Sequence, residues 1–266
     1  MNLGNTCYFN AGLQCLLHCP QLSNICILKK YTGDCEFTKE YKRFVKLYWI
    51  SRGRTCENPE KLLKLFKIKC PHFNNTEQHD TQEMIISTLE ILEKSLGKTL
   101  KDLFYGKLIQ ETVCPTETTT SEQEFSNLMI CPEPHKDPFE TYFKWNVVEG
   151  FKDTDGNTHA VATTRELFWQ PPLNLIISFK MYNGKCRIPI KDIIDISKFV
   201  HPKSPHTNRK LYKAYAMCSH AGSGNGGHYV SYTCHKNKWY LKNDEISSDV
   251  NTPSKDFFYV VFYKVI

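Results

Sequence analysis

A change of hydrophobic period near residue 105 constrains the fold of this chain more than any other feature of its sequence. Before that point, apolar residues recur three or four positions apart, which is the spacing of an amphipathic helix. From Gly106 onward, the pattern changes to short runs rich in β-branched and aromatic residues, which favour strands. Helices first and strands afterwards predict an α+β fold with two lobes, the first helical and the second mainly sheet.

Four helices are expected in the first lobe, each from an apolar stripe at helical spacing. They lie between Thr6 and Pro20, over residues 37–48, from the capping pair Asn58-Pro59 onward, and over residues 85–96. In the first of these, Cys7 falls within the opening turn.

Strands are expected over seven segments after residue 105. They are residues 108–113, 125–130, 173–181, 211–218, 229–234, 238–241 and 258–263. One short helix is expected at Asp137-Pro138-Phe139, where a capping side chain precedes a proline. The low-complexity stretch 115–124 has no apolar face to bury, and we expect it to be a mobile loop.

Composition limits the class of protein. The chain has 266 residues, 41% of them hydrophobic, which is enough to bury the core of a globular domain. No run of about twenty apolar residues could span a bilayer, and no basic and then apolar leader opens the sequence. We therefore expect a cytoplasmic or nuclear protein with no membrane partner, and we expect its twelve cysteines to be reduced.

The charge distribution gives no sign of nucleic-acid binding. The net charge of +6 is modest for this length, and the lysines are scattered along the chain. One basic stretch, residues 201–210, carries prolines and no interleaved aromatic side chains, which is typical of a solvated loop. No nucleic-acid partner is expected.

Cys7 is the strongest candidate for a nucleophile. One thiol among twelve is more often a small buried hydrophobe. At the start of a helix, however, free backbone donors and the positive end of the helix dipole stabilise the reactive thiolate. The backbone N–H of Cys7 can donate to an oxyanion, and Asn2 can supply a second donor if Gly4 lets the chain bend.

His228 is the matching candidate for a base. Four glycines within residues 222–227 precede it, which implies a backbone that passes close to a ligand. The imidazole needs a partner to fix its tautomer, and a hairpin over residues 229–241 would bring Asn243 or Asp244 beside it. Cysteine, histidine and asparagine in this order indicate papain-like chemistry.

Three segments resemble motifs of one family, the ubiquitin-specific proteases. Residues 2–8 (Asn-Leu-Gly-Asn-Thr-Cys-Tyr) resemble the Cys box of that family, residues 226–244 resemble its His box, and residues 78–84 (Gln-His-Asp-Thr-Gln-Glu-Met) resemble the segment between them. The similarity also reaches residues 171–180 and 258–263. The sequence is thus identified as a compact single-domain member of this family of papain-like cysteine peptidases.

The resemblance implies a thumb, palm and fingers architecture within one catalytic domain over residues 1–266. Residues 1–105 would form the helical thumb. Residues 106–170 would form shortened fingers and connections, and residues 171–266 would form mainly the palm.

The resemblance also implies a role for each candidate residue. Cys7 would attack the carbonyl of the last glycine of ubiquitin to give an acyl-enzyme, with His228 as its base. Asn243 would hold the imidazole, since it stands at the family's position four residues after a tryptophan, and Asp244 would be the adjacent polar residue. Asn2 would complete the oxyanion hole.

Substrate contacts are implied for several further residues. Asp80 resembles the family residue that receives the basic tail of ubiquitin, because a carboxylate can pair with an arginine; it can also cap the helix that begins after it. Gln14 and Gln78 are expected to hydrogen-bond nearby backbone. The other implied contacts are Gly226, Gly227 and Tyr229.

The sequence departs from the family pattern at the fingertip. Most relatives carry two Cys-x-x-Cys pairs there, which together bind zinc. Here Cys114 stands where the first pair would begin, Glu117 replaces its partner, and residues 157–164 contain no cysteine. We therefore expect no structural zinc, no other cofactor, and a shortened tip closed by a polar loop.

These observations predict a thiol-dependent deubiquitinase that acts as a monomer on ubiquitin or ubiquitinated proteins. Two alternatives stay open. A protease for a ubiquitin-like modifier is one, because the fingers depart most from the family pattern. A non-catalytic, ubiquitin-binding pseudoenzyme is the other, although such relatives usually lose the cysteine or the histidine and this chain keeps both.

Overall fold

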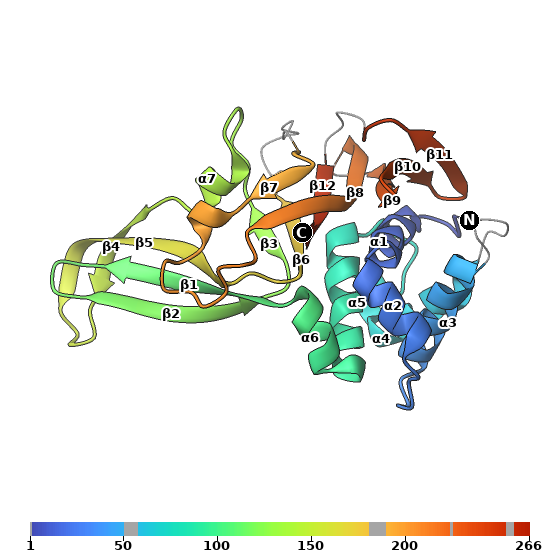
Figure 1. The fold of residues 1–266 in the computed structure, drawn as a ribbon, viewed down its shortest axis with the longest axis horizontal. Coiled ribbons are helices and arrows are strands. Elements are labelled where there is room, and N and C mark those ends of the chain that lie inside the picture. The colour runs from blue at the N-terminus through green and yellow to red at the C-terminus, as the bar shows by residue number, and fades with distance from the viewer. Residues whose placement is uncertain (1, 51–57, 181–189, 224–225, 254–257) are drawn as a thin grey trace. The chain divides into compact units, whose positions relative to one another are not determined.

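The computed structural model describes residues 2–50, 58–180, 190–223, 226–253 and 258–266 (Figure 1). Two compact units are present. The first contains Met1–Leu103 and Ala214–Tyr263, and the second contains Phe104–Lys213 and Lys264–Ile266. None of the helices in the described ranges is long and apolar enough to cross a bilayer.

Helices fill most of the first hundred residues. They are α1 (Cys7–Leu17), α2 (Pro20–Leu28), α3 (Glu36–Ile50), α4 (Glu60–Lys69), the 3-10 turn η1 (Pro71–Phe73), α5 (Thr81–Leu96) and α6 (Lys98–Phe104).

The four expected helices are confirmed as α1, α3, α4 and α5. The sequence pattern missed α2 and α6. Pro20 was expected to close the first helix, but it opens α2, because a proline at the first helical position gives up no intrahelical bond.

Helix α1 lies beside α2 and α5 in this helical group (Figure 1). It packs against α2, α5 and strand β9 (Gly226–His235), and nine of its 11 residues are buried, so it is enclosed on most sides rather than amphipathic. Gly12 permits the close approach of α5, because a Cβ there would lie 2.8 Å from the sulfur of Met84.

Aromatic rings fix the first turn of α1. The ring of Phe9 lies 5.4 Å from that of Phe66, which lies 4.9 Å from Phe73. Tyr8 stacks on Phe73 at 5.7 Å. Burial of each such ring contributes on the order of 2 kcal/mol, so the start of this helix is held by packing as well as by backbone bonds.

Neighbouring strands complete the first unit. Its strands are β8 (Leu211–Ser223), β9, β10 (Lys238–Asn243), β11 (Ile246–Val250) and β12 (Phe258–Val265), in the order β11-β10-β9-β8-β12. Two-residue turns connect β9 to β10 and β10 to β11. In the first turn, Lys236 and Asn237 both have positive φ, 50° and 61°, which suits the twist of a tight hairpin.

The second unit contains a four-stranded antiparallel sheet, which forms a long twisted ribbon in Figure 1. Its strands are β1 (Gly106–Val113), β2 (Thr118–Phe125), β5 (Thr158–Gln170) and β4 (Asn146–Lys152), in the order β2-β1-β5-β4. The unit also contains the parallel pair β3 (Leu128–Ile130) and β6 (Asn174–Phe179), the short strand β7 (Ile193–Asp195), the helix α7 (Pro138–Tyr142) and the turn η2 (Ser197–Phe199).

The α+β class is confirmed, and so is the short helix α7, where the side chain of Asp137 accepts from the N–H of Phe139 at 3.0 Å.

Two expectations about the strands were wrong. Residues 118–125 are not a loop, since β2 pairs with β1 along its whole length. Threonine favours strands, and an edge strand bonded to one neighbour does not need a buried face. The single strand expected over 125–130 is interrupted, because β2 ends at Phe125 and β3 begins at Leu128. Met181, the end of another expected strand, lies outside the described residues.

A buried carboxylate joins the two turns at one end of the four-stranded sheet. Asp153, in the turn between β4 and β5, accepts from the backbone N–H of Asn157 at 2.7 Å and pairs with Nε2 of His159 at 2.9 Å. It also accepts from the hydroxyl of Thr116, in the turn between β1 and β2, at 3.0 Å. Only 3% of the Asp153 side chain is exposed. One carboxylate therefore connects both turns.

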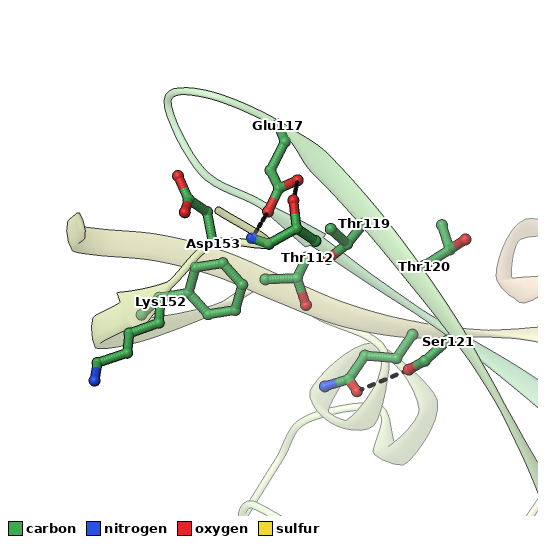
Figure 2. A pocket seen from close by; sticks show the side chains of 10 residues that line it. Thr112, Glu117, Thr119, Thr120, Ser121, Lys152 and Asp153 are labelled. Carbon is green, nitrogen blue, oxygen red and sulfur yellow. Dashed lines mark hydrogen bonds between the residues drawn. The ribbon is translucent and has the colours of Figure 1, made fainter. Parts of the chain in front are cut away.

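Glu117 adds a second connection between the same turns, as Figure 2 shows. Its carboxylate accepts from the backbone N–H of Thr154 at 2.7 Å and from the hydroxyl of that residue at 2.6 Å. We call Thr116, Glu117, Asp153, Thr154, Asn157 and His159 the tip cluster. Within the described ranges, no three His, Cys, Asp or Glu side chains are grouped so that they could hold a metal ion.

The tip cluster lowers the pKa of Asp153 well below its ordinary range. The hydrogen bond with His159 is the largest cause, and the bonds from Asn157 add to it. The ionised form of this carboxyl is therefore part of the folded structure.

Replacing Asp153 with Asn should lower the midpoint of thermal unfolding at neutral pH by several degrees, because the amide keeps only one acceptor oxygen. A carboxyl whose pKa is lowered by folding stabilises the fold above its unfolded pKa of about 4, and that contribution is lost as the pH falls toward the folded value. The difference between wild type and variant should therefore shrink between about pH 5 and pH 2, as followed by circular dichroism.

Two controls sharpen this test of the tip cluster. Asp155→Asn changes an exposed carboxylate in the same turn and should leave the midpoint unchanged. Treatment with EDTA should also leave it unchanged, since the bonds of the cluster need no metal. A midpoint that falls on chelation, or a difference that does not vary with pH, would contradict the prediction.

Candidate active site

A sharp loop delivers Cys7 to the first turn of α1. Gly4 and Asn5 both have positive φ, 92° and 49°, so the expected bend at Gly4 is present. The side-chain oxygen of Asn2 accepts from the N–H of Gly4 at 3.1 Å and from that of Thr6 at 3.2 Å, which holds the loop closed. Cys7 is 4% exposed, and its N–H lies where helix donors have no intrahelical partner.

His228 lies beside Asn243, one of the two residues that the hairpin was expected to bring there. Nε2 of His228 is 2.6 Å from Oδ1 of Asn243. Because an amide oxygen only accepts, Nε2 carries the hydrogen and donates, and Nδ1 keeps its lone pair. The imidazole is therefore held in the tautomer that can take up a proton at Nδ1.

Asp244 contacts the nucleophile's helix and loop more closely than it contacts the imidazole. Its Oδ2 is 3.9 Å from Nε2 of His228, which is beyond hydrogen-bond distance. That oxygen accepts from Nδ2 of Asn2 at 3.0 Å, and Oδ1 accepts from Nδ2 of Asn10, on α1, at 2.7 Å. One carboxylate thus ties the turn between β10 and β11 to both the loop before Cys7 and the helix that carries it.

The bond to Asp244 also orients the amide of Asn2. An amide nitrogen has two hydrogens, and this contact uses one of them. The other hydrogen is available to a second acceptor. Asn2 can therefore donate to an oxyanion as expected, while its position is fixed by bonds at both the oxygen and the nitrogen.

Two tyrosines beside the nucleophile are held as neutral phenols. Burial raises the pKa of Tyr8 to about 12, and the charge of Cys7 adds to that shift. Burial also raises the pKa of Tyr229, with the charges of Asp80 and Cys7 contributing. Tyr229 follows His228 on β9, and its pKa responds to the charges of Asp80 and Cys7. Cys7, Asp80 and His228 therefore lie in one region of the first unit.

Asp80 is confirmed as the N-cap of α5. Its Oδ1 accepts from the N–H of Gln82 at 2.6 Å and from that of Glu83 at 3.3 Å. The other oxygen accepts from the hydroxyl of Tyr259, on β12. The carboxylate is only partly exposed, and it faces the phenols of two strands.

The two expected glutamines differ in their partners. Gln78 bonds backbone as expected: its Nε2 donates to the carbonyl of Gly227 at 2.9 Å, and its Oε1 accepts from the N–H of the same residue at 2.8 Å. The amide oxygen of Gln14 instead accepts from the hydroxyl of Tyr48, on α3, at 2.9 Å. A side-chain bond thus replaces the expected backbone bond at this oxygen, because α3 brings a hydroxyl within reach of α1.

The glycines before His228 differ in how closely they are packed. A Cβ on Gly226 would meet open space. A Cβ on Gly227 would lie 2.2 Å from Nε2 of His220, and the chain therefore needs a glycine there. The backbone of β9 passes directly over the His220 ring at this point.

Sequence reasoning missed Asn10 and Tyr259. Asn10 stands three residues after Cys7, so it shares a face of the helix with the nucleophile, and that spacing could have identified it. Tyr259 gave no such signal. Its contact with Asp80 joins positions 179 residues apart in the chain.

A hollow of about 250 Å³ lies elsewhere, beside the turns of the four-stranded sheet (Figure 2). It is lined by Gln110, Thr112, Glu117, Thr119, Thr120, Ser121, Phe151, Lys152, Asp153 and Thr154. These residues all belong to the second unit, whereas every candidate catalytic residue belongs to the first. The lining of the hollow therefore contains none of the groups that could carry out the cysteine chemistry.

Comparison with known proteins shows the family to which this chain belongs. The family model described as ubiquitin carboxyl-terminal hydrolase matches residues 1–263. Ubiquitin carboxyl-terminal hydrolase 25 of Arabidopsis thaliana is 24% identical over 291 residues, which cover 93% of this chain and 44% of the relative. Usp2 of Drosophila melanogaster is 24% identical over 323 residues, which cover 99% of this chain and 34% of the relative. The human ubiquitin carboxyl-terminal hydrolase 2 is 23% identical over 336 residues, which cover 99% of this chain and 54% of the relative. This chain thus spans about a third to a half of the length of these relatives.

Solved structures share the fold. A chain of the SAGA DUB module, composed of Ubp8, Sgf11, Sus1 and Sgf73 and bound to monoubiquitin, matches with a TM-score of 0.85 at 18% identity, over 100% of this chain and 68% of that chain. The same module bound to ubiquitin aldehyde matches with a TM-score of 0.82 at 18% identity, over 100% and 69%. The papain-like α+β fold expected from the sequence is thereby confirmed.

The structure predicts one tautomer for His228. In the neutral form of His228, the ring hydrogen should reside on Nε2, as ¹⁵N shifts of the ring nitrogens in histidine-labelled protein would report. Asn243→Ala removes the acceptor and should give a mixture of tautomers, whereas Asn243→Asp keeps an acceptor and should preserve the single form. A wild-type spectrum with the hydrogen on Nδ1 would overturn this interpretation of the site.

Proposed function

Because this chain belongs to the ubiquitin carboxyl-terminal hydrolase family, a family of cysteine-type deubiquitinases, we propose that it hydrolyses the peptide or isopeptide bond after the last glycine of ubiquitin. The observation that carries this proposal is the Nε2 contact of His228 with Asn243, 2.6 Å long, on a strand that packs against the helix headed by Cys7. A nucleophile, a base and an orienting group thus lie within one unit.

Acylation uses the free lone pair of His228. Nδ1 accepts the proton of the Cys7 thiol, and the thiolate attacks the carbonyl carbon of the terminal glycine. The oxyanion that forms accepts from the backbone N–H of Cys7 and from the remaining amide hydrogen of Asn2. As the intermediate collapses, the imidazolium gives its proton to the leaving amine, and a thioester joins ubiquitin to the enzyme.

Deacylation repeats the same steps with water as the nucleophile. Nδ1 of His228 takes a proton from a water molecule, whose oxygen attacks the thioester carbonyl. The same donors hold the second oxyanion. Its collapse returns the proton to the sulfur of Cys7 and releases ubiquitin with a free C-terminal carboxylate. Asn243 keeps the ring oriented throughout by accepting from Nε2, and no charge on the amide is needed for that.

Asp80 is proposed to receive the basic tail of ubiquitin. Its Oδ1 is used by the N-cap of α5, and Oδ2 accepts a single bond from Tyr259. A carboxylate oxygen can accept more than one bond, so an arginine can add a charge-assisted contact there. Gly226, Gly227 and Tyr229 are proposed to line the path of the tail to Cys7.

A ubiquitin-like modifier is the second candidate substrate. The observation that favours it is the tip cluster, whose hydrogen bonds lie where the resemblance to the family would place a zinc site. A purely binding role receives no such support, because the nucleophile, base and orienting residue are all present. Parallel reactions with ubiquitin, SUMO and other ubiquitin-like fusions separate the two substrates.

Intact mass spectrometry provides the direct test of the nucleophile. Protein mixed with ubiquitin that carries a thiol-reactive group at its C-terminus should gain the mass of one ubiquitin, because the tail places that group beside the thiolate. Cys7→Ala should gain nothing. An adduct that persists in Cys7→Ala would assign the chemistry to another thiol.

A missing adduct is informative if the protein is folded and Cys7 still reacts with iodoacetamide. That outcome would reject ubiquitin as substrate and direct attention to another modifier. Hydrolysis of a ubiquitin C-terminal fluorogenic amide should agree with the mass measurement.

Asp80→Asn tests recognition of the tail separately from the fold. Asparagine is as good an N-cap as aspartate, so α5 should be retained. Loss of the charge should raise KM for the ubiquitin fluorogenic amide about tenfold and leave kcat nearly unchanged, as steady-state kinetics would measure. Ubiquitin whose tail arginines are replaced should give no further rise in KM with the Asp80→Asn protein. If the two changes raise KM additively, the arginine contact lies elsewhere.

A further inference from the structure

We propose that Gln78 is a positioning residue for the base, and that residues 75–80 brace the strand carrying His228 against the loop before Cys7. The observation behind this is a paired contact. The amide of Gln78 donates to the carbonyl of Gly227 at 2.9 Å and accepts from its N–H at 2.8 Å, across 149 residues of sequence. The inference rests on the proposed function, since it concerns the geometry of that same site.

Glycine dominates the strand end before His228. This residue type has no side chain to pack and the largest conformational freedom of any. Gly222 and Gly227 face each other across β8 and β9, and a Cβ on Gly222 would lie 2.3 Å from the Gly227 Cα, so the two backbones are in close contact. Gly226 has open space where a side chain would be. The paired amide contact therefore restrains a backbone that carries no side chains of its own at these two positions.

The position of Gly227 makes that restraint matter to the base. It directly precedes His228, so any rotation of its backbone changes the direction of the imidazole. The contact between His228 and Asn243 fixes the Nε2 side of the ring. The pair of bonds from Gln78 fixes the backbone from which the ring projects, and both restraints together determine where Nδ1 points.

The other end of the brace contacts the nucleophile's loop. Nδ2 of Asn5, two residues before Cys7, donates to the carbonyl of Thr76 at 2.8 Å. Thr76 and Gln78 are two residues apart, so a single short segment bonds to the approach to the nucleophile and to the residue before the base. The spacing between the side chains of Cys7 and His228 is thereby coupled to residues 76–78.

The segment itself is well anchored. The side-chain oxygen of Asn75 accepts from the N–H of Glu77 at 3.0 Å and bonds Nε2 of His79 at 2.7 Å. The His79 ring packs on Tyr8 and Phe73, with centroids 5.2 and 4.8 Å apart. Its last residue, Asp80, caps α5. The segment is therefore tied to the core through the His79 ring and to α5 through Asp80, while residues 75–78 themselves are exposed.

The test replaces Gln78 with Leu, which has a similar volume and neither amide bond. The first measurement is the rate of Cys7 alkylation by iodoacetamide against pH, quantified on the Cys7 peptide by mass spectrometry. A well-placed imidazole stabilises the thiolate, so the variant should react about tenfold more slowly at about pH 6, with its profile moved to higher pH. The second measurement is kinetics on the ubiquitin fluorogenic amide, where kcat should fall about tenfold with KM within about twofold.

Glu77→Gln is the matched control. It changes an exposed side chain next in sequence and should keep the wild-type alkylation profile and kcat. Thermal unfolding checks that the Gln78→Leu protein is folded, and Gln78→Ala replaces it if it is not. A structural role alone would lower the unfolding midpoint without moving the pH profile.

The outcomes separate the brace from the proposed function. Wild-type alkylation and kcat in the Gln78 variants would overturn the brace. A change confined to KM would also overturn it and make Gln78 a contact for the ubiquitin tail. If the wild type does not turn over ubiquitin but the alkylation profile still shifts in the variant, the brace stands and the proposed function fails.

Discussion

Helix α1 is buried on most of its sides, and the position of Cys7 depends on that burial. A helix with nine buried residues of 11 cannot rotate or slide without opening the core, so its first turn has a fixed location. Gly12 allows α5 to pack closely, and aromatic rings around Tyr8 and Phe9 hold the opening turn. Cys7 is thus placed by hydrophobic packing in which neither the imidazole of His228 nor the amide of Asn243 takes part.

Polar contacts then align the remaining groups against this fixed point. Asp244 reaches both Asn2 and Asn10, and Asn243 reaches the ring of His228. The neighbouring amide and carboxylate consequently have different roles, although they are adjacent in the chain. The amide selects a tautomer, and the carboxylate ties the turn to the helix that begins at Cys7.

Much of the helical half could be predicted from the sequence, because apolar spacing and caps are local signals. The edge strand β2 could not, since a run of threonine and glutamate has no periodic apolar face. Its pairing with β1 depends on a neighbour rather than on burial. Helix α2 was missed for a different reason. Pro20 can end one helix or begin another, and only packing selects between these two possibilities.

The sequence by itself determined that Cys7 heads a helix and that a hairpin brings Asn243 or Asp244 to His228, and the structure places Asn243 there, 15 residues along the chain. Both results follow from local geometry, since turn length and helix periodicity act over a few residues. Only the tertiary structure decided the contacts that span long stretches of chain, such as those of Asp244 with Asn10 over 234 residues and of Gln78 with Gly227 over 149. Such pairings arise when whole elements pack together, and the surfaces that decide the packing are dispersed along the entire sequence.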